Sequence, residues 1–187
     1  MEIPKLRKSP PLPFQGNKAI GRNKFYNFLN CIDNGNDMIF VDLFGGSFYL
    51  SYLVHKVFPN SKIICNDFDD YMLRIKNISK TNNLLEKIKN IIENTKRGEE
   101  LNDEQRQKID NLIRNENGFI DFLTLSFNLL YNSNITNERS KFFNKNYINR
   151  LIKKPYDDNI SDYIEGIDFV KKDWFDLYLE YFNNDNV

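Results

Sequence analysis

An acid and two glycines stand where a short apolar run meets a helical pattern, and these residue types suit the binding of a nucleotide-like ligand. The run reads Phe40-Val41-Asp42-Leu43-Phe44-Gly45-Gly46-Ser47 and is followed by helical spacing over residues 48–57. Glycine lets the backbone approach a ligand with no Cβ in the way, and the Asp42 carboxylate can accept hydrogen bonds from ammonium or hydroxyl groups. Buried parallel strands that lead into such a turn hold ligands of this kind in α/β folds.

The elements around this turn predict a βαβ unit. We expect strands at residues 39–42 and 62–65, with the helix 48–57 between them, and a further helix over residues 70–79 after Asn66-Asp67. Strands joined by a helix in this order lie parallel, with a right-handed crossover. A strand at residues 167–171 and a short helix at 176–182 then return the chain to the same sheet.

The middle of the chain has a polar composition rich in lysine and asparagine, which predicts a mostly helical insertion between strands. Asn102 with Gln105 three residues later is typical of a capping box, and residues 119–130 form the most apolar helical pattern of this part. Residues 131–146 are rich in Asn, Ser and Thr and predict a loop. The expected division is therefore an α/β part at 1–80, a helical insertion at 81–160 and a return to the sheet at 161–187.

Composition limits the classes of function. The 187 residues suit one domain, or one domain with an insertion. The 26 basic and 26 acidic side chains balance, so no overall positive field favours nucleic acid, although a local basic face is compatible with neutrality. Cys31 and Cys65 predict buried thiols in a reducing cytosol rather than a disulfide. We expect a cytoplasmic protein without a metal site or a membrane segment, and the single histidine, His55, as a helix-face residue.

Three ordered motifs carry a family resemblance: Gly16-Asn17-Lys18, then Asp42-Leu43-Phe44-Gly45-Gly46, then Asn66-Asp67. This set resembles the N-terminal part of the DNA adenine methylase family, the S-adenosylmethionine-dependent N6-adenine methyltransferases. In that family one residue separates the phenylalanine from the glycines, whereas here they are adjacent. Later in the chain, Lys172-Asp173-Trp174 resembles the family's Gly-Asp-Phe step after the third strand.

The resemblance implies a partial Rossmann-like methyltransferase sheet with a helical target-recognition insertion. It places Lys18 near the methionine carboxylate of S-adenosylmethionine, Asp67 at the ribose hydroxyls, and Asp173 with Trp174 at the adenine. The full set of implied cofactor residues is Phe14, Gly16, Lys18, Asp42, Phe44, Gly45, Gly46, Asp67, Asp173 and Trp174. Each also has a structural alternative, such as a helix cap for Asp67 or plain core for Trp174.

Double-stranded DNA is the implied partner. Asn side chains can pair with adenine, and Arg or Lys can hold phosphates. In or beside the polar segment of the insertion, the candidates are Tyr131, Asn132, Asn134, Arg139, Lys141, Lys145 and Arg150. A solvated loop is the alternative for any one of them.

One family element is absent from the sequence, namely the catalytic Asp-Pro-Pro-Tyr segment, whose acid and tyrosine hold the flipped base. The nearest string, Lys153-Lys154-Pro155-Tyr156, lacks the acid and precedes the third strand. The family places this segment at the end of the fourth strand, which lies beside the first. We therefore expect this chain to be the N-terminal portion, or one subunit, of an adenine-specific DNA methyltransferase. A degenerate remnant that folds in another way is the alternative. A second chain supplying the C-terminal half is one possible partner.

Two other functions stay open. One is a non-catalytic subunit that binds the cofactor or DNA in regulation or anti-defence. The other is a methyltransferase acting on RNA or a small molecule. A dinucleotide dehydrogenase is disfavoured, because no Gly-x-Gly-x-x-Gly follows the first strand.

Overall fold

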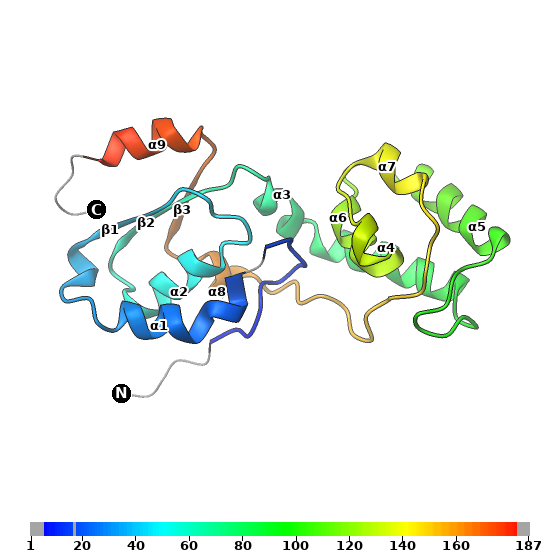
Figure 1. Cartoon of the computed structure of the whole chain (residues 1–187), viewed down its shortest axis with the longest axis horizontal. Coiled ribbons are helices and arrows are strands. Elements are labelled where there is room, and N and C mark those ends of the chain that lie inside the picture. Colours follow the sequence, from blue (N-terminus) through cyan, green and yellow to red (C-terminus); the bar gives the residue numbers. More distant parts are fainter. Residues whose placement is uncertain (1–5, 17, 183–187) are drawn as a thin grey trace. The chain divides into compact units, whose positions relative to one another are not determined.

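A computed structural model describes residues 6–16 and 18–182 of the chain, and it divides into two compact units. The sheet unit comprises residues 1–73 and 159–187, and the helical unit comprises residues 74–158 (Figure 1). The boundaries that the sequence suggested, after residues 80 and 160, lie a few residues later than these. Asn17 of the first motif is outside the described residues.

A parallel sheet of three strands forms the centre of the sheet unit. The strands are β1 (Ile39–Asp42), β2 (Lys62–Asn66) and β3 (Ile167–Val170), in the order β1-β2-β3. The register pairs Asp42 with Cys65, and Asn66 with Val170, so the carboxyl ends of all three strands meet at one edge. The predicted α/β class with a parallel sheet is confirmed. Among the described residues, no strand pairs with the outer side of β1.

Helices cover both faces of this sheet. In the view of Figure 1, α1 (Arg22–Leu29) and α2 (Tyr49–Val57) lie below the strands, and α9 (Trp174–Tyr181) lies above them. The sheet unit also contains α8 (Ser161–Ile164) and the short 3-10 helices η1 (Lys18–Gly21) and η2 (Gly35–Asp37). Tyr52 and Leu53 of α2 are almost fully buried, as expected for an amphipathic helix that crosses between parallel strands.

Buried tyrosines fix the chain ahead of the first motif. The Tyr71 hydroxyl contacts both the backbone N–H and the carbonyl of Leu12 at 3.1 Å. The Tyr49 hydroxyl donates to the carbonyl of Arg7 at 2.5 Å, and the Arg7 N–H donates to Tyr52. These bonds tie residues 7–12 to the helices of the sheet unit, which positions Phe14 immediately afterwards.

The cysteines differ in exposure. Both are free thiols, and Cys65 on β2 is buried, but Cys31 is exposed. The expectation of two buried thiols is therefore wrong for Cys31, which lies just past the end of α1. Burial raises the pKa of the Cys65 thiol, and the nearby Asp42 carboxylate adds to the shift.

The helical unit is built from four main helices. They are α4 (Ile78–Ile91), α5 (Asp103–Arg114), α6 (Phe122–Leu129) and α7 (Arg139–Phe143), with η3 (Asn132–Asn134) between the last two; α3 (Tyr71–Lys76) precedes them. The capping box of α5 is present as predicted, with Asn102 accepting from the Gln105 N–H at 2.9 Å. Residues 119–121 precede α6 rather than extend it, because the Asp121 side chain caps that helix.

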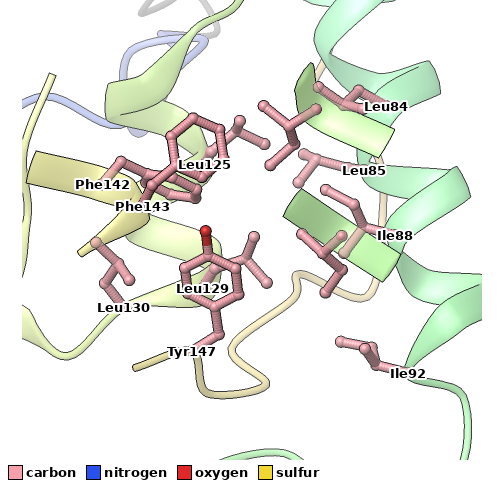
Figure 2. Packing of buried hydrophobic residues seen from close by; sticks show 12 residues of the cluster. Leu84, Leu85, Ile88, Ile92, Leu125, Leu129, Leu130, Phe142, Phe143 and Tyr147 are labelled. Atoms are coloured by element: carbon pink, nitrogen blue, oxygen red, sulfur yellow. The ribbon is translucent and has the colours of Figure 1, made fainter. Parts of the chain in front are cut away.

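One apolar cluster joins these helices. Figure 2 shows Leu84, Leu85 and Ile88 of α4 facing residues of α6 and α7. Phe142 and Phe143 of α7 belong to the cluster and are 0% and 8% exposed. The prediction of a loop over residues 131–146 is therefore wrong within 139–143, where two adjacent phenylalanines bury themselves and fold the segment into a helix.

A buried ion pair organises the polar part of the helical unit. The Arg74 Nε contacts both carboxylate oxygens of Asp121 at 3.0 Å, and a further guanidinium nitrogen donates to the Thr124 hydroxyl. Asp121 also accepts from the N–H and the hydroxyl of Thr124. Tyr156 of the Lys-Lys-Pro-Tyr string has a structural task here, since its hydroxyl accepts from Asn128 at 2.9 Å.

Candidate functional site

The carboxyl edge of the sheet carries a cavity of about 440 Å³ within the sheet unit. Ligands of open α/β sheets bind at this edge, outside the carboxyl ends of the strands, and the volume lies in the range of small-molecule sites. The lining comes from the first motif, the glycine turn and the segments after β2 and β3: Phe14, Gln15, Gly16, Lys18, Leu43, Phe44, Gly45, Gly46, Asn66, Phe68, Asp69, Asp173 and Trp174.

The glycine turn is packed too closely for side chains. A Cβ built on Gly45 would lie 2.5 Å from the Cys65 Sγ and 2.8 Å from the carbonyl oxygen of Asn66. Gly46 has φ +50° and faces the ring of Phe14, a conformation that costs glycine little. Both glycines line the cavity, so the backbone of the turn forms part of its wall.

Asp42 holds the turn from behind. One carboxylate oxygen accepts from the Phe44 N–H at 3.2 Å, and the other accepts from the Ser51 hydroxyl of α2 at 2.9 Å. Asp42 is not among the described residues that line the cavity. Its carboxylate fixes the strand-to-helix turn, so any effect on a ligand is exerted through that turn.

Asn66 connects the ends of all three strands. Its amide nitrogen donates to the carbonyl of Leu43 after β1 at 3.1 Å and to the carbonyl of Lys172 after β3 at 3.0 Å. Its amide oxygen accepts from the Lys172 N–H at 3.0 Å. Because the side chain is 1% exposed, these bonds are shielded from water and keep the floor of the cavity in a fixed shape.

Three aromatic rings stand exposed around the cavity. Phe44, Phe68 and Trp174 are 61%, 62% and 47% exposed, and the rings of Phe44 and Trp174 lie 5.8 Å apart between centroids. Large apolar side chains that gather in this way are typical of binding sites rather than of bare surface. Flat rings on the wall favour a flat ligand group that can stack between them.

Lys18 supplies the positive charge of the site. Its ammonium donates to the carbonyl of Phe44 at 3.2 Å, so it lies over the glycine turn. Gly16, two residues earlier, has φ +74° and lets the chain fold back at this point. An ammonium group at the cavity wall is suited to a carboxylate of the ligand.

The acid at the end of β2 caps a helix, which is the structural alternative that the sequence allowed for it. Asp67 is 8% exposed, and its carboxylate accepts from the N–H groups of Tyr71 at 2.6 Å and Met72 at 3.0 Å, which caps α3. Burial raises its pKa, an effect that these two backbone bonds oppose. Asp67 does not line the cavity among the described residues, whereas Asp69 does.

Phe68 and Asp69 are the residues that sequence reasoning missed. The signal was present in the run Asn66-Asp67-Phe68-Asp69-Asp70, in which acids alternate with an aromatic residue immediately after a strand. The next acid, Asp70, is paired with Lys171 at 2.6 Å. Asp69 is therefore the acid of this run that is exposed on the cavity wall.

Eight of the ten predicted cofactor residues line this one cavity. They are Phe14, Gly16, Lys18, Phe44, Gly45, Gly46, Asp173 and Trp174. Asp173 also caps α9, because its carboxylate accepts from the Phe175 N–H at 2.8 Å. The structure thus gathers residues that are 160 positions apart in the chain around one volume.

The predicted DNA-facing residues lie in the helical unit, and most of them make internal contacts. Arg150 donates to the carbonyl of Leu130 and to Asn132, and Tyr131 donates to Glu100. Lys141 is paired with Glu138. Asn134 closes the η3 turn and Lys145 is half-buried, while Arg139 lies against the ring of Phe143.

Comparison with known proteins gives one relative. The chain is 31% identical over 187 residues to a protein of Haemophilus influenzae named "Putative methyltransferase". The match covers 98% of this chain and 62% of the relative, so the chain spans less than two thirds of that protein. No family model and no solved structure matches. The chain is therefore related to a protein named as a methyltransferase.

The described residues include no helix that is long and apolar enough to cross a membrane. They also include no group of three or more His, Cys, Asp or Glu side chains placed to hold a metal ion.

Proposed function

We propose that this chain is the cofactor-binding portion of a methyltransferase that transfers a methyl group from S-adenosylmethionine to N6 of adenine in DNA. The observation that carries the proposal is the cavity of about 440 Å³ at the carboxyl edge of the sheet, where the glycine turn, Lys18 and three exposed rings meet. The relationship to the Haemophilus protein supports methyl transfer. The motif resemblance supports adenine in DNA as the acceptor.

The chemistry of the lining suits this cofactor. Lys18 would hold the methionine carboxylate, beside backbone that Gly45 and Gly46 leave bare. Phe44, Phe68 and Trp174 would stack on the adenine, which is flat and apolar on its faces. Asp69 would accept hydrogen bonds from the ribose hydroxyls, since it is the exposed acid of the wall and Asp67 is engaged in capping α3.

When bound, the cofactor supplies the electrophilic methyl group, and the protein contributes mainly position and electrostatics. The sequence contains no Asp-Pro-Pro-Tyr segment to hold the target base. We propose that a polypeptide segment outside this chain pairs with the open side of β1 and brings those groups to the cavity. On this proposal the chain alone binds the cofactor but does not methylate DNA.

Calorimetric titration of the 187-residue chain with S-adenosylmethionine tests the cofactor assignment. The three acids after β2 serve as matched variants: Asp69→Asn, Asp67→Asn and Asp70→Asn. We expect Asp69→Asn to weaken binding about 10- to 100-fold, because hydrogen bonds to a charged group are worth about 1.5–3 kcal/mol. Asp70→Asn should leave binding unchanged, since this acid is paired with Lys171.

Asp67→Asn separates two roles for the capping acid. It should lower the melting temperature, because α3 loses part of its cap, with little effect on affinity in the folded protein. If Asp67→Asn abolishes binding and Asp69→Asn does not, then Asp67 and not Asp69 accepts the hydrogen bonds from the ribose hydroxyls. A folded chain that does not bind S-adenosylmethionine contradicts the proposed cofactor. Methyl transfer to DNA by the chain alone contradicts the proposal that a segment outside this chain supplies the groups that hold the target base.

A further inference from the structure

The neutral net charge of the chain conceals a separation between its two units. Residues 74–158, the helical unit, contain 16 Lys and Arg against 12 Asp and Glu, a balance of +4. The rest of the chain contains 10 basic and 14 acidic side chains, a balance of −4. A positively charged unit attracts polyanions, and contacts with phosphates dominate nucleic-acid affinity.

Two arginines of this unit share one aromatic ring. The guanidinium carbon of Arg114, the last residue of α5, lies 4.1 Å from the ring centroid of Phe143. The guanidinium carbon of Arg139, the first residue of α7, lies 5.8 Å from the same centroid. They line an open hollow on the helical unit together with Glu138, Ser140, Phe143 and Asn144.

Packing in the apolar cluster fixes the position of the Phe143 ring on which these two arginines lie. Phe143 is 8% exposed and belongs to the apolar cluster that joins the helices, so its position is fixed by packing. It also contacts the rings of Phe122 and Phe142. A guanidinium that stacks on a ring keeps its N–H edges free to donate hydrogen bonds outward, and its planar fork matches the geometry of a phosphate.

Carboxylates do not neutralise the two guanidiniums. Across residues 6–16 and 18–182, neither Arg114 nor Arg139 takes part in an ion pair. The one acid of the hollow, Glu138, is paired with Lys141 at 2.5 Å. Arg150, which was also predicted to face DNA, differs from Arg139. Its guanidinium donates hydrogen bonds to the carbonyl of Leu130 and to the side chain of Asn132.

We propose that Arg114 and Arg139, stacked on Phe143, form a phosphate-binding site for the backbone of duplex DNA. The inference rests on the proposed function, which makes DNA the acceptor. Arg139 was already a DNA-facing candidate, and the structure adds Arg114 and the ring of Phe143 that the two arginines share. Contacts with phosphates fix the position of a protein on the duplex without reading its sequence. The site therefore contributes affinity and orientation, and the target sequence is read elsewhere.

Fluorescence anisotropy of a labelled 20-base-pair duplex, titrated with the full chain at several salt concentrations, tests the site. The variants are Arg114→Gln, Arg139→Gln and the double variant. Lys108→Gln is the matched control, because Lys108 is also an exposed cation of α5 but is paired with Glu104 at 2.6 Å. Melting curves show whether each variant folds, and calorimetry with S-adenosylmethionine on the same samples monitors the cofactor site.

Each arginine variant should bind about fivefold more weakly at 0.15 M salt, and the double variant about 25-fold, since independent losses of free energy add. The slope of log K against log salt should fall in magnitude by about 0.9 for each phosphate that the protein no longer neutralises. Lys108→Gln should stay within about twofold of the unaltered chain. Unchanged cofactor binding in all variants would show that the loss is confined to DNA.

Three results would overturn the site. If the arginine variants lose no more affinity than Lys108→Gln, the hollow is not a phosphate site, although DNA as the acceptor would stand. If a single-stranded RNA of equal length binds more tightly and depends on the same arginines, the polyanion is RNA. If the unaltered chain binds the cofactor but no duplex even at low salt, both the site and DNA as the acceptor are wrong.

Discussion

Replacing Gly45 by alanine places a methyl group at the most tightly packed of the glycines that line the cavity. The added Cβ would lie 2.5 Å from the Cys65 Sγ and 2.8 Å from the carbonyl oxygen of Asn66. Attractive contacts between heavy atoms lie at about 3.5–4.0 Å, so the turn must move by about 1 Å. The Cys65 thiol is buried and the Asn66 carbonyl is backbone at the end of β2, so neither can give way easily.

The expected cost follows from this geometry. Overpacking of a well-packed site costs about 1–3 kcal/mol, and for a chain of this length each kcal/mol lowers the melting temperature by about 2–4 °C. We therefore expect Gly45→Ala to melt roughly 2–12 °C below the unaltered chain. The bond from the Gly45 N–H to the Asn66 carbonyl, now 3.3 Å, should break as the turn moves. Because the same turn lines the cavity, affinity for S-adenosylmethionine should fall as well.

Gly21→Ala is the matched control. Gly21 has φ −81°, which alanine adopts without strain, and nothing lies within 4 Å of its added Cβ. Scanning calorimetry and titration with S-adenosylmethionine should show this variant unchanged or slightly more stable. If Gly45→Ala melts and binds as Gly21→Ala does, the turn is not close-packed and the reasoning about the cavity wall fails.

Further predictions concern a buried ion pair, a buried histidine and the aromatic wall. Asp121→Ala should destabilise the chain by about 3–5 kcal/mol, since it leaves the Arg74 charge buried without its carboxylate; a urea midpoint close to that of the unaltered chain would contradict this. The pKa of His55 is lowered by burial, with Lys56 adding to the shift and Glu165 opposing it. The unfolded chain therefore takes up the proton first as pH falls below about 6.5, so stability is complete above that pH. Below it, stability is lost at up to about 1.4 kcal/mol per pH unit, until the lowered pKa of the folded protein is passed. Urea unfolding at pH 7.5 and 5.5 should show this loss, and His55→Asn should reduce it; equal pH dependence in both proteins would refute it. Phe68→Ala should weaken cofactor binding by about 0.5–1.5 kcal/mol, the worth of a stacked aromatic pair, whereas the exposed Phe28 of α1, which does not line the cavity among the described residues, should tolerate the same change.

Local patterns in the sequence were enough to predict the sheet and its turn. Residues 39–42 form β1 as predicted, and β2 extends only one residue beyond its predicted end, because short β-rich runs between turn residues have few alternatives. The capping box at Asn102 was legible for a similar reason, since both partners lie within four residues. The cavity lining was predicted in a different way, because the residues around Gly16, Gly45 and Trp174 were implied by the family resemblance that these motifs carry.

Other features depended on contacts between distant residues. The α7 helix forms because Phe142 and Phe143 find partners on α4, α5 and α6, and a polar-looking segment gives no sign of these contacts. The choice between Asp67 and Asp69 was likewise hidden, because it depends on which carboxylate the backbone of α3 engages.

The sequence by itself determined the strands and the glycine turn, since each follows from neighbours a few positions apart. The prediction of Lys18 as a site residue came from the family resemblance, and the structure places it beside a turn that lies 26 positions later in the chain. Only the tertiary structure decided that Asp69 lines the cavity and that Arg114 and Arg139 lie on the ring of Phe143 without an ion pair among the described residues. It also divided a chain of zero net charge into two units of opposite net charge. These properties arise when side chains far apart in sequence compete for the same partners, and that competition is settled by packing.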